Sequence, residues 1–190
     1  MEEGDDADVQ RLFAANFFGA VAMIKAVLPG MRARRSGAIV NISSIGARRT
    51  PEGSGYYAAA KAALEGMSGS LRKELAPLGI TVTAVEPGAF RTDFSGRSLG
   101  QSSTVIDDYA DTAGKRRKEH DTAHDTAHGT QQGDPAKAAQ ALIAVVESSD
   151  RPGLLLLGQD ALDTFRQTLD AQRAEVDAWQ KLSASTAFDD

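Results

Sequence analysis

The sequence contains no cysteine, which excludes disulfides, thiolate metal sites and thiol catalysis and gives no sign of a secreted scaffold. Excess positive charge is also lacking. The net charge is −5, so nucleic acid is not an expected partner. The longest apolar run, residues 17–28, is interrupted by Lys25, and we expect it to be too short to cross a bilayer. The first residues are acidic where a signal or transit peptide would be basic, so the sequence predicts a soluble, cytoplasmic protein without a membrane partner.

What the chain does contain is typical of one globular domain. Its 190 residues, 42% of them hydrophobic, are enough to form one core. Three short apolar segments have the pattern of buried strands: residues 38–43, residues 79–88 with their Pro-Gly turn, and residues 153–157. Because helical patterns separate these segments, the sequence predicts an α/β fold with a partial parallel sheet and helices on both faces.

Four longer helices are expected around that sheet. The first covers residues 8–28, with hydrophobic side chains at three- and four-residue spacing, and should end at the Pro-Gly pair 29–30. The second spans residues 56–76 and is rich in small side chains. The third, residues 134–147, opens with an Asp N-cap and a Pro in the first turn. The last covers about 160–183, and we expect its hydrophobic face to pack on the body or on a subunit partner rather than to bind a ligand.

A tyrosine and a lysine give the strongest chemical signal. Tyr57 and Lys61 are one helical turn apart, and Ser44 lies thirteen residues before Tyr57, after the first strand. A phenol ionises near pH ~10, so it exchanges protons at neutral pH only where its phenolate is favoured, and an ammonium on the same helix face can supply that bias. A serine hydroxyl can hold a carbonyl or alkoxide oxygen against the phenol. Together these groups suit proton transfer to or from a secondary alcohol while a hydride moves elsewhere.

The order and spacing of these motifs resemble the short-chain dehydrogenase/reductase family, closely over residues 8–95 and loosely over residues 133–160. The resemblance implies a Rossmann-like three-layer αβα fold, the C-terminal part of a doubly wound sheet. It also implies NAD(P)-dependent oxidoreduction of an alcohol/carbonyl pair. The pattern neither separates NAD from NADP nor identifies the small-molecule substrate.

The resemblance also implies a role for each matching residue. Tyr57 would be the general acid/base, and Lys61 would bias its proton affinity and contact the nicotinamide ribose. Ser44, which fits the thirteen-residue gap better than Ser43, would orient the substrate oxygen. Asn16 would position a relay water, with a partly exposed structural amide as the alternative. The residues that would line the nicotinamide end of the cofactor site are Pro87, Gly88 and Thr92.

Two further patterns are interpreted as ordinary loops. Residues 53–58 satisfy G-x-G-x-x-A, but a long loop rather than a strand precedes them, so a phosphate loop is not expected. His120, His124 and His128 share a spacing of four, yet the residues between them form a poor helix, and no metal site is expected. These three histidines fall in residues 94–133, a polar, irregular segment predicted to be a substrate lid. The helix and tail over residues 160–190 complete the chain.

No residue matches the family's glycine-rich loop or its adenine pocket, so we expect residues 1–190 to form a single truncated domain. The missing part would be on the order of 80 to 100 residues, because each βαβ unit takes about 30. Its loss would expose a hydrophobic sheet edge. The two long helices that pair in relatives are present, so a homodimer or homotetramer is expected. Two alternatives stay open: a catalytically inactive fragment or pseudoenzyme that only binds or dimerises through its long helices, and a misplaced start codon.

Overall fold

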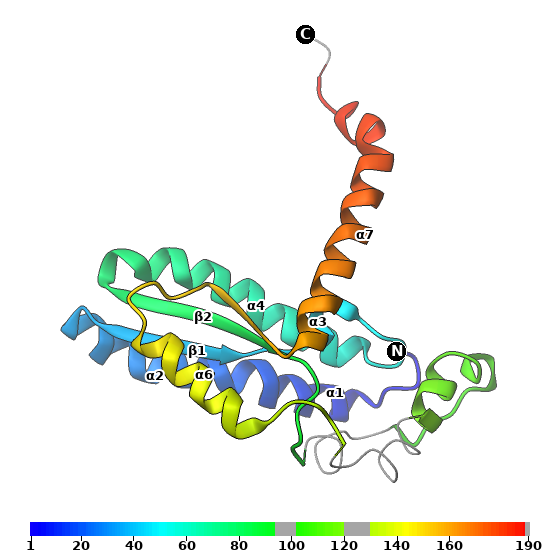
Figure 1. Cartoon of the computed structure of the whole chain (residues 1–190). Coiled ribbons are helices and arrows are strands. Elements are labelled where there is room, and N and C mark those ends of the chain that lie inside the picture. The colour runs from blue at the N-terminus through cyan, green and yellow to red at the C-terminus, as the bar shows by residue number, and fades with distance from the viewer. Residues whose placement is uncertain (94–101, 120–129, 189–190) are drawn as a thin grey trace.

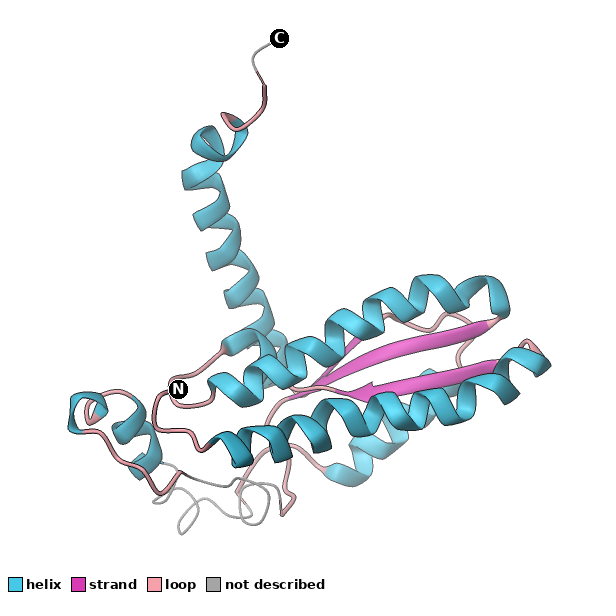
Figure 2. Cartoon of the chain, turned by 180° about the vertical axis from the view of Figure 1, so that it is seen from behind, coloured by secondary structure: helices cyan, strands magenta, loops and turns pink. Residues whose placement is uncertain are grey.

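Three parallel strands carry helices on both faces in the computed structural model, which describes residues 1–93, 102–119 and 130–188 (Figures 1 and 2). The elements in chain order are α1 (Asp6–Phe13), the π-helical turn η1 (Ala14–Phe18), α2 (Gly19–Arg34), β1 (Gly37–Ile42), α3 (Gly46–Arg49), α4 (Gly55–Leu75), η2 (Ala76–Leu78), β2 (Ile80–Pro87), η4 (Asp107–Tyr109), α6 (Pro135–Glu147), β3 (Leu154–Leu157) and α7 (Gln159–Ala184). The expected α/β fold with a parallel sheet is confirmed.

The sheet has the strand order β1-β2-β3. Gly37 pairs with Ile80 at one end of the β1–β2 ladder, and Ile42 pairs with Val85 near the other end. The outer edge of β1 pairs with no strand in the described part of the chain. An edge strand presents unpaired backbone N–H and C=O groups, and Ile42 is 45% exposed there, so this edge is open to another strand.

The core lies between the sheet and the face covered by α2 and α4 (Figure 2). Its buried cluster consists of Ile24, Ile39, Leu75, Ile80 and Val82. Full burial of such a side chain stabilises the fold by about 1.5–3 kcal/mol, and these contacts hold helix α4 against both long strands. Helix α6 lies on the opposite face (Figures 1 and 2).

The first long helix does not end at Pro29, as expected from sequence, but continues through Arg34. A proline removes one backbone donor, which is a local cost. Leu28 and Met31, on either side of it, pack against the buried core cluster, and this packing outweighs the local loss. The helix ends where Arg35 adopts the left-handed conformation with φ of 55°.

This first helix, taken over its whole 29 residues (6–34), is long and apolar enough to cross a membrane, with a mean hydropathy of 1.7 over its best 18-residue window. The expectation that the segment is too short for a bilayer therefore does not hold by length and composition. Core helices of soluble proteins and signal sequences pass the same test. Here Ile24 is buried in the core cluster, although only 6% of the apolar window is buried.

Helix α6 begins as its sequence predicts. Asp134 is the N-cap, and its carboxylate accepts hydrogen bonds from the backbone N–H groups of Ala136 and Lys137. We expect Asp134→Ala to lower the free energy of unfolding by about 1 kcal/mol, because two helix donors lose their acceptor. Urea denaturation measures this loss. Asp170→Ala, which removes an exposed carboxylate inside α7, is the matched control and should change stability by less than about 0.5 kcal/mol.

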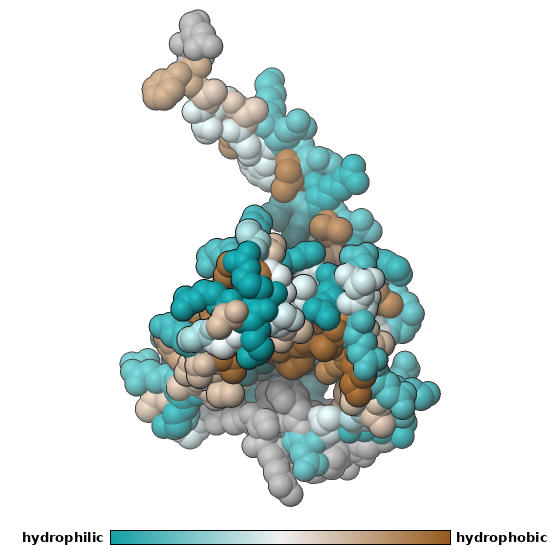
Figure 3. Space-filling view, turned by 90° about the vertical axis from the view of Figure 1, so that its left-hand side faces the viewer, coloured by the Kyte–Doolittle hydropathy of each residue, from teal (hydrophilic) through white to brown (hydrophobic). Residues whose placement is uncertain are grey.

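Helix α7 packs on the body only at its beginning and then projects away from it (Figure 1). Ala161 is buried, whereas Leu169, Val176 and Trp179 are 53%, 67% and 60% exposed. Of the two predicted surfaces for the hydrophobic face of this helix, the body therefore does not cover its outer turns, and packing on a subunit partner stays a prediction. Further hydrophobic side chains are exposed on α2 and α6, and Figure 3 shows hydrophobic surface gathered between polar flanks on one side of the molecule.

Candidate active site

The predicted catalytic serine lies at the carboxyl edge of the parallel sheet. Just beyond the end of β1, the backbone N–H of Ser43 donates to the carbonyl of Val85 at 2.7 Å, and Ile45 N–H donates to the carbonyl of Pro87 at 3.2 Å. Ser44 stands between these two anchored residues. The carboxyl ends of parallel strands are where α/β proteins bind ligands, so the fold places Ser44 where a site is expected.

Ser44 and Tyr57 meet, as the sequence predicts. Tyr57 lies in the first turn of α4, and its side chain is hydrogen-bonded to Ser44. The Ser44 Oγ also accepts the backbone N–H of Gly46 at 3.0 Å. A Cβ on Gly46 would lie 3.1 Å from Ser44 Oγ and 3.3 Å from the Tyr57 ring, so a residue without a side chain suits this close approach.

Lys61 lies one turn further along α4. Its Nζ donates to the carbonyl of Ile42 at 3.0 Å and stands 5.8 Å from the centroid of the Tyr57 ring. The ammonium is thus held near the phenol by the last residue of β1. Both side chains are half-buried, so each remains reachable from solvent.

Burial shapes the protonation of this pair. It raises the pKa of the Tyr57 phenol, and the hydrogen bond with Ser44 opposes that rise. Burial also lowers the pKa of Lys61. Both shifts favour the uncharged forms. The hydrogen bond with Ser44 therefore draws the phenol toward its ionised form, and the role predicted for Lys61 stays a prediction.

Asn16 lies in the π-helical turn η1, which packs against α4. Its side-chain Nδ2 donates to the carbonyl of Leu12 at 3.0 Å. The amide thereby satisfies a carbonyl at the point where the helix widens. π-Helical turns are frequent at functional sites, and Asn16 lies in such a turn beside the helix that carries Tyr57 and Lys61.

The residues predicted to line the cofactor follow β2. Pro87 ends the strand beside Ser44, and the N–H of Gly88 donates to Leu157 at 2.8 Å. A Cβ on Gly88 would lie 2.2 Å from a carboxylate oxygen of Asp160, so any larger residue here would require the Asp160 side chain to move. Thr92 is exposed on the following loop, beyond the bridge between residues 90 and 133.

Sequence reasoning missed a charged cluster below the site. Arg48 Nε contacts Glu86 Oε1 at 3.0 Å, and a terminal nitrogen of Arg48 contacts Glu65 Oε2 at 2.9 Å. Glu86 is fully buried, and burial raises its pKa, with the charge of Glu65 adding to the rise. The signal was present, because a carboxylate inside an otherwise apolar strand requires a charged or hydrogen-bonding partner.

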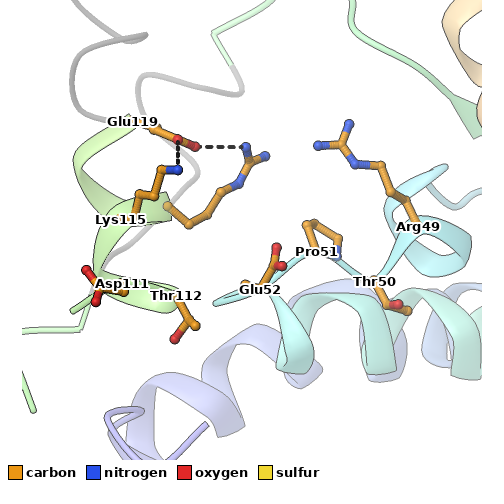
Figure 4. A pocket seen from close by; sticks show the side chains of 9 residues that line it. Arg49, Thr50, Pro51, Glu52, Asp111, Thr112, Lys115 and Glu119 are labelled. Atoms are coloured by element: carbon orange, nitrogen blue, oxygen red, sulfur yellow. Dashed lines mark ion pairs between the residues drawn. The ribbon is translucent and has the colours of Figure 1, made fainter. Parts of the chain in front are cut away.

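A polar hollow of about 460 Å³ opens beyond α3 (Figure 4). Residues 49–52 form one side, and Asp111, Thr112, Lys115, Arg116 and Glu119 form the other. Glu119 contacts Arg116 at 3.8 Å and Lys115 at 4.0 Å. Gly46, the first residue of α3, lies beside Tyr57, and Arg49, its last residue, lines the hollow. Gly46 and Arg49 are about one helical turn, ~5 Å, apart.

The first residues of the chain hold the segment that faces this hollow. Glu3 is buried; its carboxylate accepts the N–H of Ile106 at 2.9 Å and pairs with Arg117 at 2.7 Å. Tyr56 OH donates to the carbonyl of Met1 at 3.1 Å. Within the region predicted to be irregular, residues 113–119 are helical. The start of the chain therefore joins the beginning of α4 to the predicted lid.

This contact should respond to acid. The hydrogen bond from Ile106 and the charge of Arg117 lower the pKa of Glu3 below its ordinary 4.5. A lowered carboxyl pKa contributes stability that is present above pH 4.5 and lost as the pH falls through the folded-state value. We expect amide protection in residues 102–119, measured by hydrogen exchange with intrinsic rates corrected, to fall below pH 4.5.

Glu3→Gln provides the control for that measurement, because an amide does not ionise in this range. The variant should show weaker protection of residues 102–119 already at pH 7, without the additional acid step. Protection that stays constant in the wild-type chain down to pH 3.5, relative to α6, would contradict the role given to Glu3.

Metal ligands are not gathered at this site. Within the described ranges, no group of three histidine, cysteine or carboxylate side chains could hold a metal ion. His120, His124 and His128, considered and set aside from sequence, lie outside the described residues.

Comparisons with known proteins agree with this geometry. A profile of the family described as short chain dehydrogenase matches residues 1–102. The chain is similar to oxidoreductase BOA17 of Botryotinia fuckeliana (strain B05.10), 34% identical over 186 residues, which cover 96% of this chain and 66% of that protein. It is also similar to retinol dehydrogenase 8 of Homo sapiens, 47% identical over 97 residues, or 51% of this chain and 31% of that protein.

Solved structures show the same relationship. The crystal structure of a short-chain dehydrogenase from Streptomyces avermitilis is 40% identical and superposes with a TM-score of 0.85, covering 99% of this chain and 66% of that one. The chain thus spans at most 66% of the length of these three relatives. The matched sequence profile and the shared fold lead to one conclusion: the chain belongs to the short-chain dehydrogenase family.

Proposed function

We propose that the chain contributes to an NAD(P)-dependent oxidoreductase that interconverts an alcohol and a carbonyl. One observation carries this proposal: Ser44, Tyr57 and Lys61 meet at the carboxyl edge of a parallel sheet, with Ser44 hydrogen-bonded to Tyr57. A hydroxyl, a phenol and an ammonium so arranged can bind a carbonyl oxygen and deliver a proton to it.

Each residue has a defined task in this proposal. Tyr57 donates its phenolic proton to the substrate oxygen during reduction and takes it back during oxidation. Ser44 holds the same oxygen and stabilises the phenolate that reduction leaves behind. Lys61 supplies a positive charge near that phenolate, and Asn16 positions a water through which the proton is replaced.

The residues around the site fit the nicotinamide end of a dinucleotide. The Lys61 ammonium, bound to one carbonyl, has donors left for ribose hydroxyls. The turn formed by Pro87 and Gly88 lies at the same edge, joined to Ser44's neighbour Ile45 by a backbone hydrogen bond. When bound, NAD(P) supplies the hydride acceptor or donor. The preference between NAD and NADP stays open.

A second candidate function follows from the open edge of β1. The family's glycine-rich turn has no counterpart in this sequence, and no strand pairs with β1 in the described part of the chain. A site to which no such turn contributed would lack much of the positioning on which the rate depends. An inactive member that only binds or dimerises is therefore the alternative.

The location and the partners belong to the same proposal. We infer a cytoplasmic protein whose partner is a small-molecule alcohol or carbonyl. The segment predicted to be the substrate lid, residues 94–133, lies partly outside the described residues. Self-association through the long helices is supported by Gly66 and Gly69 on α4, since each faces open space that a neighbouring helix could enter.

Fluorescence titration of the purified chain with NADH and with NADPH, combined with its mass by light scattering, tests the proposal. Saturable binding by a defined oligomer, followed by turnover of alcohol substrates, is the expected result. A monodisperse sample that binds neither cofactor at millimolar concentration would favour the inactive alternative.

A further inference from the structure

Three charged side chains from three different elements meet beneath the corner that carries the catalytic serine. Arg48 comes from α3, Glu65 from α4 and Glu86 from β2. The guanidinium contacts both carboxylates, at 2.9 Å and 3.0 Å. It also stands 5.5 Å from the centroid of the Phe165 ring, on α7. A single side chain therefore ties α3 to the three elements around it.

The Glu65 carboxylate uses both oxygens. Oε2 pairs with Arg48, and Oε1 accepts the hydroxyl of Ser43 at 2.5 Å. Ser43 is buried and is the direct neighbour of Ser44. Arg48 fixes the carboxylate's rotation, so that one oxygen stays directed at Ser43. Charge-assisted hydrogen bonds are short and directional, so this chain of contacts transmits position.

A second connection runs through α3 itself. Arg48 lies in the same short helix as Gly46, whose N–H donates to Ser44 Oγ at 3.0 Å. Because that oxygen accepts from Gly46, the hydroxyl proton of Ser44 is available for Tyr57. Displacing α3 would therefore turn the Ser44 hydroxyl away from the phenol.

We propose that Arg48 and Glu65 are positioning residues, which hold Ser44 in hydrogen-bonding geometry with Tyr57 through Ser43 on one side and Gly46 on the other. This inference rests on the proposed function, because it takes Ser44 and Tyr57 as the reacting pair. In this proposal Arg48 and Glu65 act through Ser44 and not on the substrate oxygen.

A purely structural role for the cluster makes a different prediction. A cluster that only joined α3 to its neighbours would change stability when altered and leave the Ser44–Tyr57 hydrogen bond as it is. The proposal requires that the hydrogen bond itself changes. Arg48→Lys separates the two, because an ammonium keeps the positive charge but lacks the planar fork that reaches two carboxylates.

The test is NMR of the full chain labelled with ¹³Cζ-tyrosine, whose phenolic carbon responds to hydrogen bonding of the phenol oxygen. The sequence has three tyrosines, and Tyr57→Phe assigns the resonance of interest. Ser44→Ala should shift the Tyr57 resonance, and Arg48→Lys should shift it in the same direction. In the Ser44→Ala background, Arg48→Lys should cause no further shift, since both act on one interaction.

Arg49→Lys is the matched control, because Arg49 is the next residue in α3 and its side chain is exposed. Arg49→Lys should leave the Tyr57 resonance unmoved. The Tyr56 resonance should stay unmoved in every variant. If Arg48→Lys fails to fold by circular dichroism, Glu65→Gln provides the same comparison, since its amide oxygen still accepts from Ser43. An unmoved Tyr57 resonance in the folded variant, or an undiminished shift in the Ser44→Ala background, would overturn the proposal. The measurement needs no cofactor and no turnover, so it tests the Ser44–Tyr57 hydrogen bond even if the chain proves inactive.

Discussion

Replacing Tyr57 by Phe should lower kcat by about 10²–10⁴-fold in any preparation of the chain that turns over. The phenol is the only group in the Ser44–Tyr57–Lys61 arrangement that can donate a proton and retain a stabilised anion. Phenylalanine keeps the ring packed and removes only the acid. Steady-state kinetics at saturating cofactor would measure the loss.

Tyr56→Phe is the matched control for this substitution. Its hydroxyl donates to the carbonyl of Met1, away from Ser44, so turnover should change less than about threefold. Cofactor affinity should be similar in the wild type and Tyr57→Phe, because the substitution removes an acid rather than a binding surface. A Tyr57→Phe enzyme with wild-type kcat would show that the proton comes from another group.

Removing the Arg48 side chain should cause the largest loss of stability. Arg48→Leu leaves Glu86, which is fully buried, and Glu65, whose side chain is 12% exposed, without their cation. Breaking a buried pair by deleting one partner costs about 3–5 kcal/mol. Since Arg48 keeps 39% of its side chain exposed, we expect the lower end, about 3 kcal/mol, in urea denaturation at pH 7.5.

The loss should depend on pH in a defined direction. Burial and the nearby Glu65 raise the pKa of Glu86 above 4.5, and Arg48 opposes that rise. A raised carboxyl pKa contributes stability that is full below the unfolded value and is lost as the pH rises through the folded value. The deficit of Arg48→Leu should therefore be small at pH 4.5 and grow toward pH 7.5. An equal deficit at both values would contradict a role for charge.

A double variant sharpens this result. Arg48→Leu combined with Glu86→Leu removes the guanidinium and the most buried carboxylate together. Replacing a buried ion pair by hydrophobic residues is often neutral, so the double variant should recover part of the stability that Arg48→Leu loses. A double variant less stable than Arg48→Leu would assign the loss to packing rather than to an uncompensated charge.

Sequence patterns correctly predicted those elements that depend on interactions between residues close together in the chain. The strand and helix around Tyr57, and the N-cap of α6 at Asp134, follow from periodicity and from short-range hydrogen bonding. Contacts between distant residues decide the rest. The continuation of α2 past Pro29 depends on packing against strands that follow it, and the cluster of Arg48 with Glu86 joins positions 38 residues apart.

The surface that covers the outer half of α7 could not be predicted for a different reason. Its spacing of hydrophobic residues correctly predicts a helix with an apolar face, but periodicity does not say which surface that face meets. The same holds for Ser44: its place near Tyr57 follows from the family resemblance, whereas the Gly46 contact that orients its hydroxyl emerges only from the fold.

The projection of α7 determines what optical spectroscopy can see in this protein. The chain has a single tryptophan, Trp179, and its indole is 60% exposed on the outer part of that helix. Its emission will be that of a hydrated indole in the native state and will change little when the sheet melts. Tryptophan fluorescence is therefore a poor measure of unfolding of the core. It is sensitive instead to whatever covers the helix, so a blue shift with rising protein concentration would register association before any change in folding.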